Sequence, residues 1–223
     1  MTPTTRLSGD ERSQKEMDIV LPAEIRAARR SDWKAVAAIT AEAFADDPVM
    51  SWVFRSPRAI LSMLRVLARD VYVAWGVCHL HSGGGATMWM PSASAGKPSS
   101  LTMAAFALGQ LRLGNSGALA RGEALQRLMQ EHHPTAPHLY LFTIGARPEA
   151  QGQGIGKALL APVLAACDRQ GMPIYLENSN PVNHGFYVAH GFEQMGKFSA
   201  GDDAPPMAPM WRAPRESANE PHD

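Results

Sequence analysis

The segment QGQGIG at residues 151–156 lies between a run typical of a buried strand and a run typical of a helix. The preceding run, HLYLFTIGA at residues 138–146, is apolar on both faces, as a central strand covered on both sides should be. The following run, residues 154–171, has helical spacing of apolar residues and ends at a glycine that suits a helix terminus. Residues 172–177 then read as the next strand, which completes a right-handed βαβ unit. This feature predicts an α/β fold.

The spacing of the glycines excludes two common phosphate-binding motifs. A Walker A loop needs glycine at the position of Gln151 and Ser or Thr at the position of Ala158. A Rossmann fingerprint needs glycine at the position of Lys157. The remaining pattern, Q-x-x-G-x-G, leaves two interpretations open. It is either a tight turn whose glycines serve packing, or a backbone loop that binds an anion at a helix start.

The rest of the chain predicts further strands and helices that complete a mixed sheet. The segment DDPVMSWVF at residues 46–54 is expected only to turn the chain. The expected elements are a short strand within 24–32, helices at 33–45 and 57–74, a hairpin at 76–91, two helices within 101–132, a short helix within 180–192, and a hairpin of 192–199 with 206–212.

Composition argues against several classes of function. The chain has 21 basic and 21 acidic residues and a formal net charge of zero, so nothing attracts it generally to nucleic acid or to an anionic membrane. Cys78 and Cys167 each lie in an apolar stretch and read as reduced core residues. The polar start of the chain lacks the apolar region of a signal peptide, and no apolar run approaches the roughly 20 residues of a membrane helix. We therefore expect a cytoplasmic protein.

The chain is expected to form one domain at residues 21–212, with a flexible leader at 1–20 and a flexible tail at 213–223. A helical insert at about 92–135 separates the hairpin at 76–91 from the strand at 138–146. The insert either covers a site or forms a dimer contact. A monomer and a homodimer are therefore both open.

The segment IGARPEAQGQGIGKALL resembles motif A of the GNAT N-acetyltransferases, and NPVNHGFYVAHGF resembles their motif B region. The resemblance covers roughly residues 24–212, and its specific part is 138–192. Within that superfamily the chain looks most like the puromycin N-acetyltransferases, in AFADDP, in GATMWMP and in the proline at position 162, although puromycin itself is not the expected substrate. The resemblance implies a mixed, mostly antiparallel central sheet of about six to seven strands flanked by helices. In that fold the fourth and fifth strands splay apart.

The resemblance also implies acetyl-CoA as the cosubstrate and no metal. The glycine loop would bind its pyrophosphate, and the exposed edge of strand four would bind its pantetheine arm, with Gly145 consistent with a bulge there. Two asparagines match positions near the thiol, and they suit caps of the short helix equally well. The cofactor-binding candidates are Ile144, Gly145, Ala146, Gln151, Gly152, Gln153, Gly154, Ile155, Gly156, Lys157, Asn180 and Asn183.

The implied reaction is direct attack of a primary amine, expected on a small molecule, on the acetyl thioester. Tyr187 matches the family's general acid beside the sulfur. The base has three candidates: His138 and Tyr140 share one face of strand four, and Glu177 ends strand five. A strand-four backbone N–H, from residue 144 or 146, would meet the oxyanion.

The acceptor site is expected between the first helices and the last hairpin, where acidic pairs and aromatic residues occur. Such a pocket would suit an amphipathic cationic amine, and loop solubility explains the acids equally well. The residues are Asp46, Asp47, Asp202, Asp203, Trp52, Phe54 and Trp211. Two other functions stay open: a CoA-binding domain without catalysis, and a protein or peptide N-acetyltransferase.

Overall fold

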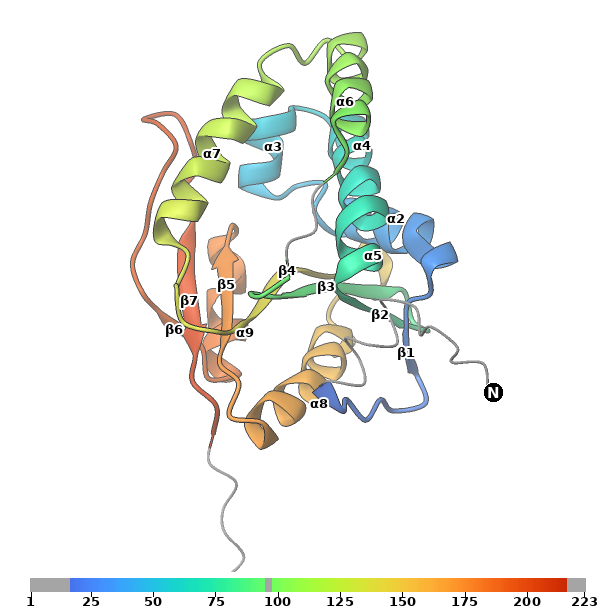
Figure 1. Ribbon diagram of the computed structural model, residues 1–223, viewed down its shortest axis with the longest axis vertical. Coiled ribbons are helices and arrows are strands. Elements are labelled where there is room, and N and C mark those ends of the chain that lie inside the picture. The colour runs from blue at the N-terminus through green and yellow to red at the C-terminus, as the bar shows by residue number, and fades with distance from the viewer. Residues whose placement is uncertain (1–16, 95–97, 216–223) are drawn as a thin grey trace, which may run out of the picture.

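A seven-stranded sheet runs through the centre of the computed structural model, which describes residues 17–94 and 98–215 (Figure 1). The strand order is β1-β2-β3-β4-β5-β7-β6. The strands are β1 (Ile25–Ala27), β2 (Val77–His81), β3 (Gly85–Pro91), β4 (Leu139–Ala146), β5 (Ile174–Asn178), β6 (Glu193–Gln194) and β7 (Ala208–Arg212). Neighbouring strands pair antiparallel except β4 and β5, which are parallel. The predicted mixed, mostly antiparallel sheet is confirmed.

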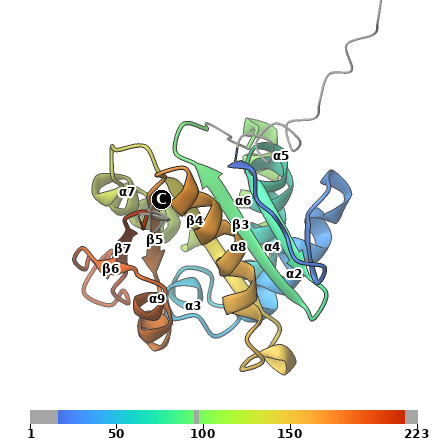
Figure 2. The ribbon, with the colours of Figure 1, turned by 90° about the horizontal axis from the view of Figure 1, so that it is seen from below.

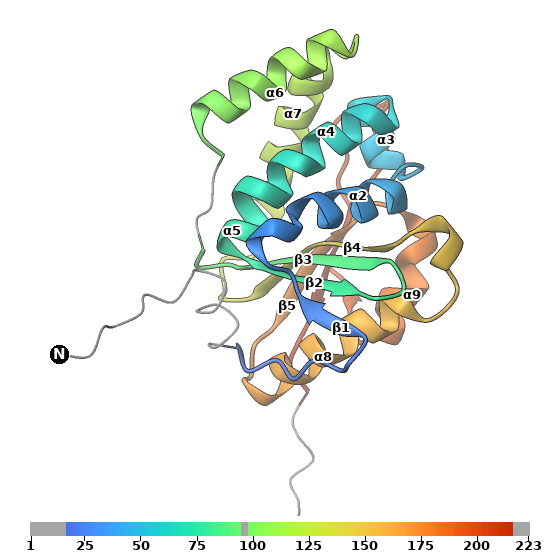
Figure 3. The ribbon, with the colours of Figure 1, turned by 90° about the vertical axis from the view of Figure 1, so that its right-hand side faces the viewer.

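Helices cover both faces of this sheet. One layer contains α2 and α4 to α7, and α8 lies on the opposite face (Figure 3). Viewed from below, α8 crosses β3 and β4 (Figure 2). The helices are α2 (Trp33–Ala43), α3 (Pro48–Phe54), α4 (Pro57–Leu67), α5 (Val73–Trp75), α6 (Ser100–Arg112), α7 (Ala118–His132), α8 (Ile155–Arg169) and α9 (His184–Ala189). None of the helices that the structure describes is both long and apolar enough to cross a membrane.

Two apolar cores hold these layers together. On the face of α2 and α4, Ile60 and Leu64 belong to the same buried cluster as Met88 of β3. On the face of α8, Leu160 packs in a cluster with Trp89, the neighbour of Met88. Successive residues of a strand point to opposite faces, so β3 contributes to both cores. Cys78 and Cys167 are buried, as expected of core residues.

The pairing of β4 with β5 ends after two residues. Leu139 pairs with Ile174 and Tyr140 pairs with Tyr175. Beyond Tyr140, β4 continues beside β3 as far as Ala146, while β5 pairs with β7. The expected splay is therefore present. It leaves the β5-facing edge of β4 with backbone groups that another partner can satisfy.

The bulge in β4 lies nearer the middle of the strand than expected. Leu141 and Thr143 pair with adjacent residues of β3, which leaves Phe142 as the extra residue. Gly145, where we expected the bulge, is regularly paired. Its lack of a side chain serves packing instead, because a Cβ there would lie 2.5 Å from the Cβ of Ala43 on α2.

The segment expected only to turn the chain contains helix α3. Asp47 is its N-cap, and the Asp47 side chain accepts a hydrogen bond from the backbone N–H of Met50 at 2.9 Å. Pro48 occupies the first turn, where its missing N–H costs nothing. An N-cap residue followed by proline is the signal that predicts a helix here.

The described residues at both ends of the domain extend beyond the expected boundaries. Met17 is buried, and its carbonyl accepts a hydrogen bond from a side chain just after α8. At the other end, the backbone N–H of Arg215 donates to Asp168 at 2.8 Å. Met17 and Arg215 therefore contact the domain, although they fall within the expected leader and tail. The rest of the leader (1–16), the rest of the tail (216–223) and residues 95–97 of the insert lie outside the described residues.

Candidate functional site

The glycine loop between β4 and α8 has a backbone that requires glycine at two positions. Gly152 and Gly154 have φ angles of +75° and +79°, in the left-handed region. A Cβ on either residue would meet nothing within 4 Å, so packing does not explain these two glycines. Packing does explain Gly156, where a Cβ would lie 3.3 Å from the ring of Phe186. Backbone conformation thus requires glycine at positions 152 and 154, packing requires it at 156, and anion binding by the loop stays a prediction.

The same loop presents the start of α8 to solvent. Gly154 is the N-cap and makes no side-chain capping hydrogen bond. The amide side chains of Gln151 and Gln153 donate to carbonyls within the loop region, at 3.3 Å and 3.0 Å, which stabilises the turn. Lys157 is exposed in the first turn of the helix. Free amides and a helix dipole, together with this lysine, suit a phosphate group.

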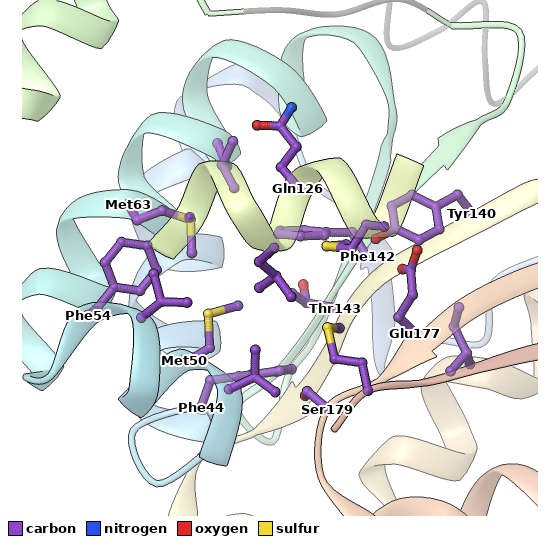
Figure 4. A pocket seen from close by; sticks show the side chains of 18 of the residues that line it. Phe44, Met50, Phe54, Met63, Gln126, Tyr140, Phe142, Thr143, Glu177 and Ser179 are labelled. Carbon is purple, nitrogen blue, oxygen red and sulfur yellow. The ribbon is translucent and has the colours of Figure 1, made fainter. Parts of the chain in front are cut away.

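A pocket of about 450 Å³ lies between the sheet and helices α3, α4, α6 and α7 (Figure 4). It is on the opposite side of the β4–β5 separation from the glycine loop. Its volume is in the range of small-molecule sites, about 300–1,000 Å³. Because α6 and α7 belong to the insert, the insert covers this site. That is one of the two roles that the sequence left open.

The pocket has an apolar end and a polar end. Met50, Phe54 and Met63 lie together at one end, and Tyr140 and Glu177 lie at the other (Figure 4). The lining is largely apolar between these ends, with Phe and Met side chains from several helices. The shape therefore suits a molecule with an apolar body and one polar or charged group.

Glu177 is a buried carboxylate at the polar end. Its side chain is only 1% exposed. Neither carboxylate oxygen has a hydrogen bond of good geometry among the residues that the structure describes, although the neighbouring phenols of Tyr140 and Tyr175 interact with the carboxylate. Buried polar groups are nearly always hydrogen-bonded, and an unpaired buried charge is costly. Glu177 is therefore the strongest candidate in the pocket for binding a cation.

Tyr140 and Tyr175 lie beside Glu177 on the paired ends of β4 and β5. Burial raises the pKa of Tyr140 well above its usual value, and the charge of Glu177 raises it further. The same two causes raise the pKa of Tyr175. Both phenols are therefore protonated at neutral pH and cannot accept a proton. This finding argues against Tyr140 as the base.

His138 does not line the pocket itself. It is 1% exposed, and its Nδ1 lies 2.7 Å from the carbonyl oxygen of Ala136. Its Nε2 lies 3.0 Å from Nε2 of His133, which does line the pocket. The Nδ1 atom of His133 lies 3.7 Å from Oε1 of Glu177. His133 escaped the sequence analysis because it follows the last helix of the insert, far along the chain from the recognised motifs.

Tyr187 lies on α9 and lines the pocket where β4 and β5 separate, together with Ile144 and Asn183. Burial raises the pKa of the Tyr187 phenol, and the nearby carboxylate of Asp47 raises it further. The phenol therefore stays protonated over the neutral range, in which state it donates a hydrogen bond.

Asn180, Asp47 and Asp203 have structural roles. Asn180 accepts a hydrogen bond from the turn that follows it, which is the capping role left open above. Asp47 is buried and accepts a hydrogen bond from Ser179 at 2.5 Å, which connects α3 to the end of β5. Asp203 accepts a hydrogen bond from the indole of Trp52 at 3.2 Å. Within the described part of the chain, no member of the two acidic pairs lines the pocket.

Comparisons with known proteins agree with this geometry. Residues 118–192 match the model of the acetyltransferase (GNAT) family. An uncharacterized N-acetyltransferase of Schizosaccharomyces pombe is 40% identical over 53 residues, which are 24% of this chain and 22% of that protein. The matched segment thus spans about a fifth of the length of this curated relative.

Solved structures show the same fold. An acetyltransferase of Corynebacterium glutamicum, described as histone acetyltransferase HPA2 and related acetyltransferase, has a TM-score of 0.61 at 22% identity, over 87% of this chain and 98% of that one. The C-terminal condensation domain of Ebony, in complex with beta-alanyl-dopamine, has a TM-score of 0.58 at 11% identity, over 87% of this chain and all of that one (100%). The nearer resemblance to the puromycin N-acetyltransferases stays a prediction.

The family match covers the glycine loop, β5 and α9, which carry the candidate site. The likeness to the solved structures extends over most of the chain. Residues 118–192 thus resemble the GNAT acetyltransferase family, and the chain, in which β4 splays from β5, shares the fold of the two solved structures.

Proposed function

We propose that the protein is an enzyme that transfers the acetyl group of acetyl-CoA to the primary amine of a small molecule. One observation carries the proposal. A single pocket is lined by Ile144 of β4 and by Tyr187 of α9 and extends beneath the insert to Glu177. The predicted cofactor side and a buried acidic group thus share one cavity. Such an arrangement suits a reaction that holds two molecules in contact.

Acetyl-CoA would bind along the unpaired edge of β4 and the glycine loop that follows it. The loop around Gly152 and Gly154, with Lys157, offers backbone donors and positive charge to a pyrophosphate. The unpaired edge of β4 up to Ala146 offers backbone groups to the pantetheine amides. When bound, acetyl-CoA supplies an acetyl thioester that an amine attacks directly. The reaction then needs no nucleophilic cysteine or serine.

The acceptor is proposed to be an amine with an apolar body. Its ammonium group would lie against Glu177, and its body would occupy the apolar end around Met50, Phe54 and Met63. A cation beside the buried carboxylate would offset part of the cost of burying that charge. The cover formed by α6 and α7 favours a small molecule over a protein tail, which would need an open groove.

The side chains of the pocket have proposed roles. Glu177 accepts a proton from the ammonium, because only a neutral amine is a nucleophile. Tyr187, held protonated by burial, donates to the sulfur as negative charge develops there. A backbone N–H of β4, at residue 144 or 146, stabilises the oxyanion.

The test is thiol release from acetyl-CoA in the presence of a panel of amines, with mass spectrometry of the products. The panel contains hydrophobic primary amines, small polar primary amines and lysine peptides. We expect acetylated hydrophobic amines. Binding of acetyl-CoA without any product would favour the non-catalytic alternative, and acetylation of the peptides alone would favour the protein-directed alternative.

Gly122 supplies a matched control for the acceptor site. It lies on α7 in the lining of the pocket, and a Cβ there would make only an ordinary contact of 3.9 Å with Val53. Gly122→Ala should therefore keep activity, whereas Gly122→Phe should fill space between α3 and α7 and raise KM for the amine. Both variants should bind acetyl-CoA normally. Equal activity of the two would place the acceptor elsewhere.

A further inference from the structure

We infer that His133 is a positioning residue for Glu177 that completes a proton relay from the acceptor amine to solvent. The inference rests on the proposed function and extends it, because it gives the insert a part in the chemistry. His133 immediately follows α7, so the same segment that covers the pocket would also supply the outlet for its proton.

The Glu177 and His133 side chains differ in their exposure to solvent. Glu177 is 1% exposed, and His133 is 33% exposed. Oε1 of Glu177 and Nδ1 of His133 are separated by 3.7 Å. Glu177 is therefore enclosed, whereas the His133 side chain is partly open to water. The imidazole is the group that connects the buried carboxylate to the surface.

The hydrogen bonds around His138 and His133 select one tautomer of each ring. A carbonyl oxygen only accepts, so the Nδ1 of His138, 2.7 Å from the carbonyl of Ala136, carries its proton. Burial lowers the pKa of His138, so the ring is neutral and its Nε2 has a lone pair. His133 must then donate from its Nε2 across the 3.0 Å contact. A neutral His133 therefore presents the Nδ1 lone pair toward Glu177.

This geometry leaves two proton acceptors 3.7 Å apart, so a proton passes between them only when the contact shortens to hydrogen-bond distance or one water bridges it. In the proposed step, an N–H bond of the ammonium breaks and an O–H bond forms on Glu177. The proton then moves to Nδ1 of His133, which becomes an imidazolium beside a restored carboxylate, and the amine keeps the electron pair with which it attacks. Loss of the proton to water from His133 returns the pair to its starting state. The net charge of amine, Glu177 and His133 is unchanged until that release.

The other titratable groups around the pair do not compete for this proton. Tyr140 and Tyr175 flank Glu177 from β4 and β5, and Tyr72 faces it from the segment between α4 and α5. Burial, followed by the charge of Glu177, raises the pKa of all three phenols. They stay protonated and cannot accept. His138 is neutral and fixes the orientation of His133.

The test uses His133→Gln, in which the amide can still donate to His138 but cannot hold a relayed proton. The matched control is His132→Gln at the neighbouring position, where the imidazole contacts the carbonyl of Leu128 and stacks on Phe198. We expect kcat of H133Q to fall by about 10²-fold at neutral pH, the lower end of a general acid–base contribution. The loss should shrink at high pH, where the amine is already neutral, and the KM for acetyl-CoA should not change.

A second variant, His133→Ala, keeps the inference testable if the glutamine is poorly tolerated. Added imidazole should restore part of its activity, which a purely structural role would not allow. A pH profile of H133Q parallel to that of the wild type, or an equal loss in H132Q, would overturn the relay. Those outcomes leave the proposed function intact as long as the wild type acetylates an amine. An inactive wild type would instead overturn the proposed function.

Discussion

Glu177→Gln is expected to make the protein more stable and less active. The folded state buries this carboxylate with neither oxygen in a hydrogen bond of good geometry among the described residues. A buried polar group without a partner costs about 1–3 kcal/mol, and more if it is charged. The neutral amide has the same shape and adds two donors. For a chain of this size 1 kcal/mol corresponds to about 2–4 °C in Tm, so we expect a rise of roughly 2–12 °C.

The loss of activity follows from the same charge. A hydrogen bond to a charged group contributes about 1.5–3 kcal/mol, so loss of the carboxylate should raise KM for the amine by about 10- to 150-fold. The variant also lacks the proton acceptor, so kcat should fall as well. Affinity for acetyl-CoA should be unchanged, because its proposed loop lies on the other side of the splay.

The matched control is Asp168→Asn, the same chemical change at a carboxylate that is well paired. Asp168 accepts two hydrogen bonds of 2.7 Å from Arg212, whose side chain is 2% exposed. Removal of one partner of a buried ion pair costs about 3–5 kcal/mol, so this variant should lose stability. Urea denaturation, thermal melts and steady-state acetyl transfer measure both variants. A destabilised or fully active E177Q would refute the reasoning.

Three further predictions concern the loop, the general acid and the response to acid. Gly154→Val should abolish the stabilisation by acetyl-CoA, which is about 2.7 kcal/mol at 100 times Kd and is seen as an increase in Tm. The reason is that φ at Gly154 is +79° and the backbone must approach the ligand. A normal increase in Tm in a folded variant would exclude the loop as the binding site. Tyr187→Phe should lower kcat and kcat/KM together by a factor of about 10². Its affinity for CoA, measured by calorimetry, should change by less than about threefold. An unchanged kcat would exclude Tyr187 as the general acid. Burial alone would raise the pKa of Asp168, but hydrogen bonds from Arg212 and from the Arg215 N–H outweigh it and lower the pKa. Its stabilisation is therefore present at neutral pH and lost as pH falls below about 4, so the pH dependence of urea midpoints should flatten in D168N, and parallel curves would contradict it.

The parts of the fold that follow local rules were predictable from the sequence. The glycine loop was predictable because glycine marks the positions whose φ angles require it. The splay was predictable because the neighbouring segments resemble a family that has it. Helix α3 was missed although Asp47 and Pro48 carry its signal.

Other parts depend on tertiary contacts that no local pattern reports. Gly145 is needed because α2 packs close to the sheet, and the bulge falls at Phe142 because of pairing with β3. The pocket forms only when the insert folds over the sheet, and this packing brings His133 to Glu177. The separation of these two residues along the chain concealed their contact.

The central claim is that this pocket transfers an acetyl group to a primary amine. It is tested most directly by thiol release from acetyl-CoA with a hydrophobic primary amine and with the N,N-dimethyl derivative of the same amine. The account predicts release of one thiol for each acetylated primary amine, and no release above background with the dimethyl derivative. Equal release with both compounds, or tight binding of acetyl-CoA with no acetylated amine from the panel, would contradict it.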